Sequence, residues 1–161
     1  MKAWTTAAVG LLACVLATGC GDDDPTAPDL AVERIEFSLL NRTGPTTGRV
    51  RITGHIRNIG TDYLSSPGQQ QLQLWELVPG ARERLVARRD FQNLPAQGRL
   101  SVSYDRTWNA ATMREFPPDY RVVISLDPDI FIDGNPDNDD SNLRNNTHTE
   151  SGRRINDLFD E

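Results

Sequence analysis

The feature that most constrains the fold is the strict alternation of apolar and polar residues in "GRVRITGHIRNIG", residues 48–60. Val50, Ile52 and Ile56 fall on one side of an extended chain, and the arginines between them fall on the other. Successive side chains of a β-strand point to opposite faces, so this period of two is typical of a strand with one buried face. The segment is therefore expected to cover an apolar core.

Similar short segments recur along the chain and are separated by turn-forming residues. Helical periodicity is nearly absent, and a parallel sheet would need crossover helices for which the chain has no room. We therefore expect an all-β fold, an immunoglobulin-like antiparallel β-sandwich of about seven strands, with a closed barrel as the alternative. A shift of phase between Val32 and Ile35 predicts a bulge in the first strand or a change of sheet there.

The amino terminus resembles a bacterial lipoprotein signal. Lys2 precedes a short apolar run that ends in "LATGC", where small residues lead into Cys20. This run is shorter than the roughly 20 apolar residues of a membrane span. We expect residues 1–19 to be a signal peptide and Cys20 to carry the lipid; an ordinary secretory signal cleaved nearby is the alternative. The protein would then be anchored to a bacterial membrane in the cell envelope, facing the periplasm or the exterior.

The rest of the chain divides simply. Residues 20–28 are acidic and contain proline, which is typical of an extended tether. Residues 29–150 carry the strand patterns and are expected to form one domain, and residues 151–161 are expected to be a carboxyl-terminal tail. The only other cysteine, Cys14, lies in the signal peptide, so the domain must be stabilised by burial and not by a disulfide. The net charge of −6 argues against nucleic acid as a partner.

Three segments resemble the CARDB family, the cell-adhesion-related domain found in bacteria. They are "PDLAV" (28–32), "VRITGHIRNIGTDYL" (50–64) and "LDPDIFIDGNPDNDDSNLRNN" (126–146). The resemblance implies an immunoglobulin-like sandwich on exported proteins, with a role in adhesion or binding and no catalysis. The asparagines and the glycine in these segments are expected to stabilise turns, because a buried asparagine side chain can bond backbone groups that a sharp turn leaves unpaired. These residues are Asn58, Gly60, Asn145 and Asn146.

The third segment is also rich in the oxygen ligands that Ca²⁺ prefers. Its spacing does not fit the EF-hand pattern, since Asn138 and Arg144 stand where that loop needs glycine and glutamate. Aspartate and asparagine are also ordinary turn formers, so a purely polar turn is the alternative. The tentative Ca²⁺ ligands are Asp127, Asp129, Asp133, Asn135, Asp137 and Asp139.

No recognisable catalytic motif is present in the sequence. We therefore expect a non-catalytic adhesion, binding or structural module with an unknown protein or glycan partner. The alternative is an envelope protease inhibitor that acts through the loop of residues 61–69, with Tyr63 and Leu64 near its tip. Trp75 is expected to be the central core aromatic, and an exposed, sugar-stacking Trp75 is the alternative.

Overall fold

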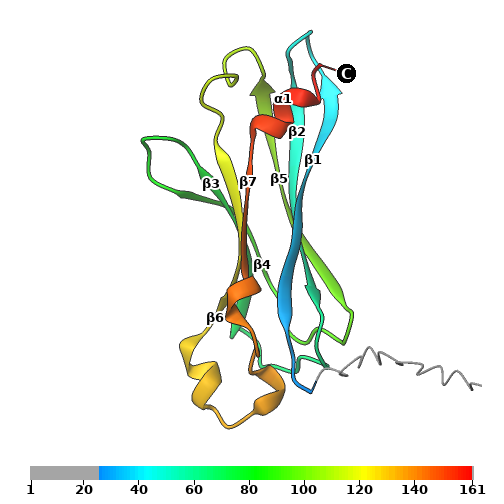
Figure 1. Ribbon diagram of the computed structural model, residues 1–161, viewed down its shortest axis with the longest axis vertical. Helices are drawn as coiled ribbons and strands as arrows, with labels where there is room; N and C mark the ends of the chain where they lie inside the picture. The colour runs from blue at the N-terminus through cyan, green and yellow to red at the C-terminus, as the bar shows by residue number, and fades with distance from the viewer. Residues whose placement is uncertain (1–25, 161) are drawn as a thin grey trace, which may run out of the picture.

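The computed structural model describes residues 26–160, which form two antiparallel sheets packed face to face (Figure 1). One sheet has the order β1-β2-β5 and the other the order β4-β3-β6-β7. The expected all-β, immunoglobulin-like sandwich is thereby confirmed. The strands are β1 (Leu30–Arg42), β2 (Thr47–Asn58), β3 (Gln70–Leu77), β4 (Arg84–Asp90), β5 (Arg99–Asn109), β6 (Asp119–Leu126) and β7 (Thr147–Ser151).

The strand pairing explains the two sequence patterns that led to this fold. In β2 the apolar positions Val50, Ile52 and Ile56 are fully buried, while the arginines between them face outward. In β1 the register with β2 shifts between Val32 and Arg34, which confirms the predicted bulge. The extra residue restores the apolar phase, so that Ile35 points into the core again.

The core lies between the two sheets, and one glycine allows them to approach closely. A Cβ on Gly54 of β2 would overlap Val122 of β6, which belongs to the opposite sheet. Only glycine fits at this spacing without movement of one sheet. The largest fully buried side chains include two tyrosines, Tyr63 and Tyr120, and the apolar residues Leu30, Ile52, Ile56, Leu72, Leu74, Ile130 and Ile155.

The two ends of the sandwich differ. β1 begins at the end where the acidic loop between β6 and β7 lies, at the bottom of Figure 1. This loop contains three 3₁₀ turns, η1 (Pro128–Ile132), η2 (Pro136–Asn138) and η3 (Leu143–Asn145). The opposite end carries the short helix α1 (Arg153–Asp157).

Among residues 26–160, no helix is long and apolar enough to cross a membrane. The expected signal peptide and Cys20 lie outside the described residues.

The prediction that Trp75 is the central core aromatic is wrong. In β3 the inward positions are Gln70, Leu72, Leu74 and Glu76, so Trp75 is half-buried on the outer face of its sheet. Trp108 on β5 is 2% exposed and takes the core position instead.

The carboxyl-terminal segment was also expected to be a tail outside the domain, and in its first ten residues it is not. Ile155 and Phe159 belong to the core, and Trp108 Nε1 donates a hydrogen bond of 2.8 Å to Asn156 Oδ1. Residues 151–160 therefore close one end of the sandwich.

Candidate binding surfaces

The outer face of the four-stranded sheet collects side chains that are typical of recognition surfaces. We call it the tryptophan face. Residues that lie opposite each other in an antiparallel pair of strands share a face, so the strand register identifies the residues that lie beside Trp75. The central members of the tryptophan face are Gln71, Gln73 and Trp75 of β3, Leu85, Arg88 and Asp90 of β4, Arg121, Val123 and Ser125 of β6, and Thr147 and Thr149 of β7.

Hydrogen bonds order the centre of this face. Trp75 Nε1 donates to Gln73 Oε1 at 3.0 Å, and Gln73 Nε2 donates to Gln71 Oε1 at 3.1 Å. These two hydrogen bonds fix the orientation of the indole ring and of the two glutamine amide groups. Arg121, which lies opposite Trp75, is paired with Glu83. The result is a sheet face with one oriented aromatic ring, surrounded by amides, hydroxyls, two guanidinium groups and the carboxylate of Asp90.

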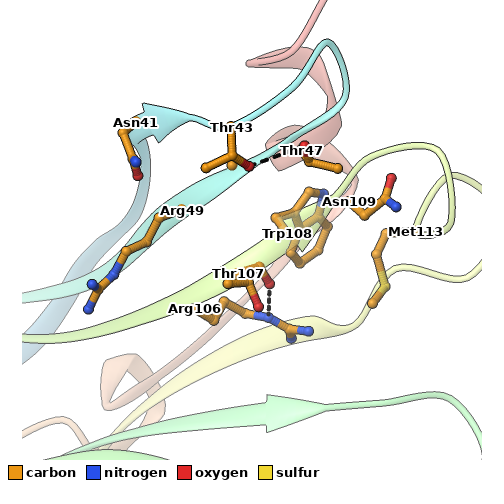
Figure 2. A pocket seen from close by; sticks show the side chains of 10 residues that line it. Asn41, Thr43, Thr47, Arg49, Arg106, Thr107, Trp108, Asn109 and Met113 are labelled. Carbon is orange, nitrogen blue, oxygen red and sulfur yellow. Dashed lines mark hydrogen bonds between the residues drawn. The ribbon is translucent and has the colours of Figure 1, made fainter.

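A second candidate is a hollow of about 500 Å³ beside the ends of β2 and β5, shown in Figure 2. Its lining has hydroxyl, amide, guanidinium, indole and thioether groups, and no acidic side chain. The lining residues are Asn41, Thr43, Thr47, Gly48, Arg49, Arg106, Thr107, Trp108, Asn109 and Met113.

The arginines of this hollow already have anionic partners. Arg106 pairs with the buried carboxylate of Glu76 and lies over the Trp108 ring, with its guanidinium carbon 5.1 Å from the ring centroid. Arg49 lies 3.6 Å from Asp105, whose pKa is lowered chiefly by its hydrogen bonds to Arg51. Each of these carboxylates is shared with a second arginine, Asp105 with Arg51 and Glu76 with Arg84, so the two acids offset only part of the positive charge beside the hollow.

Glu76 of β3 links its strand to three others near the hollow, β4, β5 and β6. Its side chain is 3% exposed, and it accepts hydrogen bonds from Arg84 at 2.6 Å, from Arg106 and from Tyr120 at 3.2 Å. A buried carboxylate is tolerated when it is paired and hydrogen-bonded in this way. The pKa of Arg84 is raised in turn, mainly by the hydrogen bond to Glu76. The cluster is thus a structural link between the two sheets.

The acidic loop does not assemble the tentative Ca²⁺ ligands into a carboxylate cluster. Among the residues that the structure describes, no three histidine, cysteine, aspartate or glutamate side chains are placed to hold a metal ion. Asp127, Asp133 and Asn135 instead accept hydrogen bonds from backbone N–H groups two residues further on, at 2.8–3.2 Å. This is the turn chemistry that was the alternative interpretation. Asp129 and Asp137 supply the N–H groups of two of these turns.

The predicted structural role of Asn58 is confirmed. Its side chain is fully buried, donates to the carbonyl oxygens of Thr61 and Leu94 at 2.6 and 2.8 Å, and accepts from the N–H of Gly60 at 3.0 Å. Gly60 is required for a different reason, because a Cβ there would overlap the carbonyl oxygen of Ala27. The N–H groups of Ile59 and Thr61 donate to the carbonyl oxygens of Asp29 and Ala27 at 2.7 and 3.0 Å, and these bonds fasten the turn after β2 to the chain segment that enters β1.

Asn145 and Asn146 act differently from the expectation that they bond backbone groups. Asn145 Nδ2 donates to a carboxylate oxygen of Asp29 at 2.8 Å, and Asn146 Nδ2 donates to Asp140 Oδ2 at 2.7 Å. Asn145 therefore joins the acidic loop to the start of the domain, and Asn146 links two positions within the loop.

The loop of residues 61–69 does not have the shape expected of an inhibitory loop. Tyr63 is fully buried and pairs with Leu94 through two backbone hydrogen bonds, so it cannot stand at an exposed tip. Leu64 is exposed, but its N–H donates to the carbonyl oxygen of Asp137 at 2.8 Å. The loop is thus packed against its neighbours on both sides of its expected tip.

No family model matches this chain, and no curated protein or solved structure matches it either. The resemblance to the CARDB family stays a prediction. The tryptophan face was missed because Trp75 was placed in the core. Its signal was nevertheless present in "QQLQLWEL", where glutamine, glutamine and tryptophan alternate with leucines at the spacing of one strand face.

Proposed function

We propose that this protein is a non-catalytic lipoprotein of the bacterial cell envelope whose immunoglobulin-like domain binds a glycan through the tryptophan face. The observation that carries the proposal is the position of Trp75. Its ring is half-buried on the outside of the four-stranded sheet and is held by Gln73, although an aromatic residue of this size would gain more from burial in the core.

The chemistry of the face suits a sugar ring. The apolar side of a pyranose stacks on an indole, and its hydroxyl groups need donors and acceptors at the rim of the ring. Gln71 and Gln73 supply amide groups on one side, and Thr149 supplies a hydroxyl two strands away. Tryptophan and arginine are also the side chains most often enriched where binding energy concentrates.

The proposal of a lipid anchor rests on the sequence around Cys20. Lipid transfer requires the thiol of that cysteine, so Cys20→Ser should accumulate as an unprocessed precursor that carries no lipid and keeps its signal peptide. Globomycin, which blocks cleavage of lipoprotein signals, should have the same effect on processing of the unmodified protein. Normal cleavage of the Cys20→Ser variant with release into the medium would contradict the anchor.

Glycan binding can be followed through tryptophan fluorescence, since the expected mature chain keeps only Trp75 and the buried Trp108. Acrylamide should quench Trp75 selectively, and a bound saccharide should protect it. We would titrate neutral and acidic oligosaccharides, including peptidoglycan fragments and chitooligosaccharides. Protection from quenching should be saturable for at least one class.

The matched variants are Trp75→Ala and Phe116→Ala. Phe116 is 67% exposed and lies in the segment between β5 and β6, so its removal controls for the loss of an exposed aromatic elsewhere. Glycan retention in a pull-down should be lost in Trp75→Ala and kept in Phe116→Ala. Equal retention by all three proteins, or the absence of saturable protection, would refute the tryptophan face as a glycan site.

A further inference from the structure

Three asparagines in the acidic loop are oriented by carboxylates. Asn138 Nδ2 donates to Asp133 at 2.9 Å, Asn145 Nδ2 donates to Asp29 at 2.8 Å, and Asn146 Nδ2 donates to Asp140 at 2.7 Å. A carboxylate can only accept in such a contact, so each amide must present its NH₂ group to the acid. The direction in which each Oδ1 points is therefore fixed by chemistry and is not an arbitrary choice between amide oxygen and nitrogen.

Four side-chain oxygens in this loop are buried without a hydrogen-bond partner within residues 26–160. They are the Oδ1 atoms of the three asparagines and of Asp139. Asn138 is 1% exposed and Asn146 is 5% exposed, so solvent does not reach them freely. Buried acceptors without a donor are costly, and four of them within nine consecutive residues need a common explanation.

The surroundings of these oxygens are negatively charged and uncompensated. None of the ion pairs among residues 26–160 involves Asp29, Asp133, Asp139 or Asp140. Asp140 is itself 6% exposed and lies near Asp29. Burial raises the pKa of the Tyr63 hydroxyl, and the charges of Asp140, Asp133 and Asp139 add to that effect.

We propose that this cluster binds a divalent cation of the Ca²⁺ type through the buried oxygens of Asn138, Asp139, Asn145 and Asn146. Ca²⁺ accepts amide and carboxylate oxygens in flexible geometry, whereas Mg²⁺ demands a near-ideal octahedron. Only one of the four oxygens belongs to a carboxylate, so affinity is expected in the weak range of extracellular modules, with a dissociation constant of about 10⁻⁴–10⁻³ M. The ligand set differs from the aspartates that cap the turns.

The position of the cluster gives the cation a structural role. Asp140 accepts from the N–H of Leu30 at 3.3 Å, and the N–H of Ser141 donates to the carbonyl oxygen of Pro28 at 2.9 Å. The loop thus lies against the residues that lead into β1, at the lower end of the sandwich in Figure 1. A bound cation would join the loop to the point where the chain enters the domain, independently of the tryptophan face.

The test is thermal unfolding and calorimetric titration of the purified protein in chelator, in CaCl₂ and in MgCl₂. A ligand at 100 times its dissociation constant increases the ratio of folded to unfolded protein about 100-fold, which corresponds to a rise in Tm of about 5–10 °C for a domain of this size. CaCl₂ at 10–50 mM should approach this shift, and MgCl₂ should give less than about one fifth of it.

Two variants of similar chemistry separate a specific site from general attraction by acids. Asp139→Asn should weaken Ca²⁺ binding at least about 10-fold, because it removes the only charged ligand. Asp137→Asn removes an exposed charge two residues away and should leave the affinity within about 2-fold. Equal weakening by both variants would mean that the loop attracts cations only diffusely, and would overturn the proposal.

A measurement on the unmodified protein covers the case in which Asp139→Asn fails to fold. Tb³⁺ bound in the cluster should luminesce on excitation of Tyr63, which is buried beside these acids, and CaCl₂ should displace it competitively. No luminescence, together with no titration heat and no shift of Tm up to 50 mM CaCl₂, would show that the buried oxygens are satisfied by water, and would end the proposal.

Discussion

Replacement of Trp108 by alanine should be among the most destabilising single changes in the domain. Its side chain is 2% exposed, so truncation removes most of the roughly 150–250 Å² that a buried tryptophan covers. A Trp→Ala change in a core costs about 3–5 kcal/mol. The Asn156 oxygen that accepts from Trp108 Nε1 would also lose its partner, which adds about 1 kcal/mol or more. The expected loss of unfolding free energy is therefore about 4–6 kcal/mol.

Urea unfolding followed by far-ultraviolet circular dichroism measures this loss without relying on the residue that is removed. Trp75→Ala is the matched control, because it deletes the same side chain from the outer face and should cost less than about 1 kcal/mol. A domain of typical stability, about 5–15 kcal/mol, could be unfolded outright by Trp108→Ala. Trp108→Phe, expected to cost about 1–3 kcal/mol, keeps the comparison measurable. Equal losses at Trp75 and Trp108 would refute the assignment of the two faces of the sandwich.

Further substitutions test the packing and the buried charges. Gly54→Ala should cost about 1–3 kcal/mol in urea unfolding because its Cβ meets Val122, and adding Val122→Ala should recover part of that loss instead of adding to it. Glu76→Ala should cost about 3–5 kcal/mol, since it leaves two arginines without their buried partner, and strict additivity with an Arg106 variant would contradict this. The pKa of the Asp105 carboxyl is lowered in the folded state. Asp105 therefore stabilises the folded protein fully above its unfolded pKa of about 4, and this contribution is lost as the pH falls through the folded pKa. Stability of Asp105→Asn, measured from pH 6 to pH 2.5, should therefore converge on that of the unmodified protein at the acidic end. Truncation after Gly152 should yield an unstable or aggregated protein, because it removes Phe159 and other core residues, and a normal Tm would show that the segment is dispensable.

The strand pattern could be predicted from the sequence because it follows directly from burial on one face. In β2 each inward position is apolar or glycine, so the period of two is unbroken until Asn58. The bulge in β1 was equally visible, since a single extra residue moves every later apolar side chain to the other face. These features depend on local sequence and on the presence of a core, and not on which distant residues form it.

Which face of β3 points into the core could not be predicted in the same way. Leu72 and Leu74 indicate one face and Trp75 and Leu77 the other, so hydrophobicity alone does not decide between them. Glu76 decides it, because its carboxylate points inward to meet arginines from β4 and β5. Those partners lie 8 and 30 residues away in the chain, and their convergence is a property of the assembled sandwich.

The ligands of a candidate site in the acidic loop could not be predicted from the sequence for the same reason. Counting aspartates identified a segment with many oxygen ligands, but it could not show which oxygens the fold already uses. Asp133 accepts from Asn135, Asn138 and Gln69, and these bonds lower its pKa, with the Asn138 bond contributing most. The oxygens left without partners belong mainly to asparagines, which a search for carboxylates passes over.

β1 begins at the acidic end of the domain, and the proposed lipid anchor precedes it in the chain, which leads to a final prediction about access to the tryptophan face. The strands run along the long axis of the domain, so this face is parallel to that axis and not at its tip (Figure 1). The roughly ten residues from Cys20 to Leu30 can span at most about 35 Å, so an anchored domain stays close to the lipid surface. Deletion of residues 22–25 should therefore leave the affinity for a soluble oligosaccharide unchanged, while it reduces retention of cells or vesicles on an insoluble glycan several-fold. The comparison needs the lipidated protein in vesicles and the same variant in detergent, where the restriction is absent. Equal retention by the full-length and shortened tethers in vesicles would contradict a sideways-facing site and would favour contact through the end that carries α1.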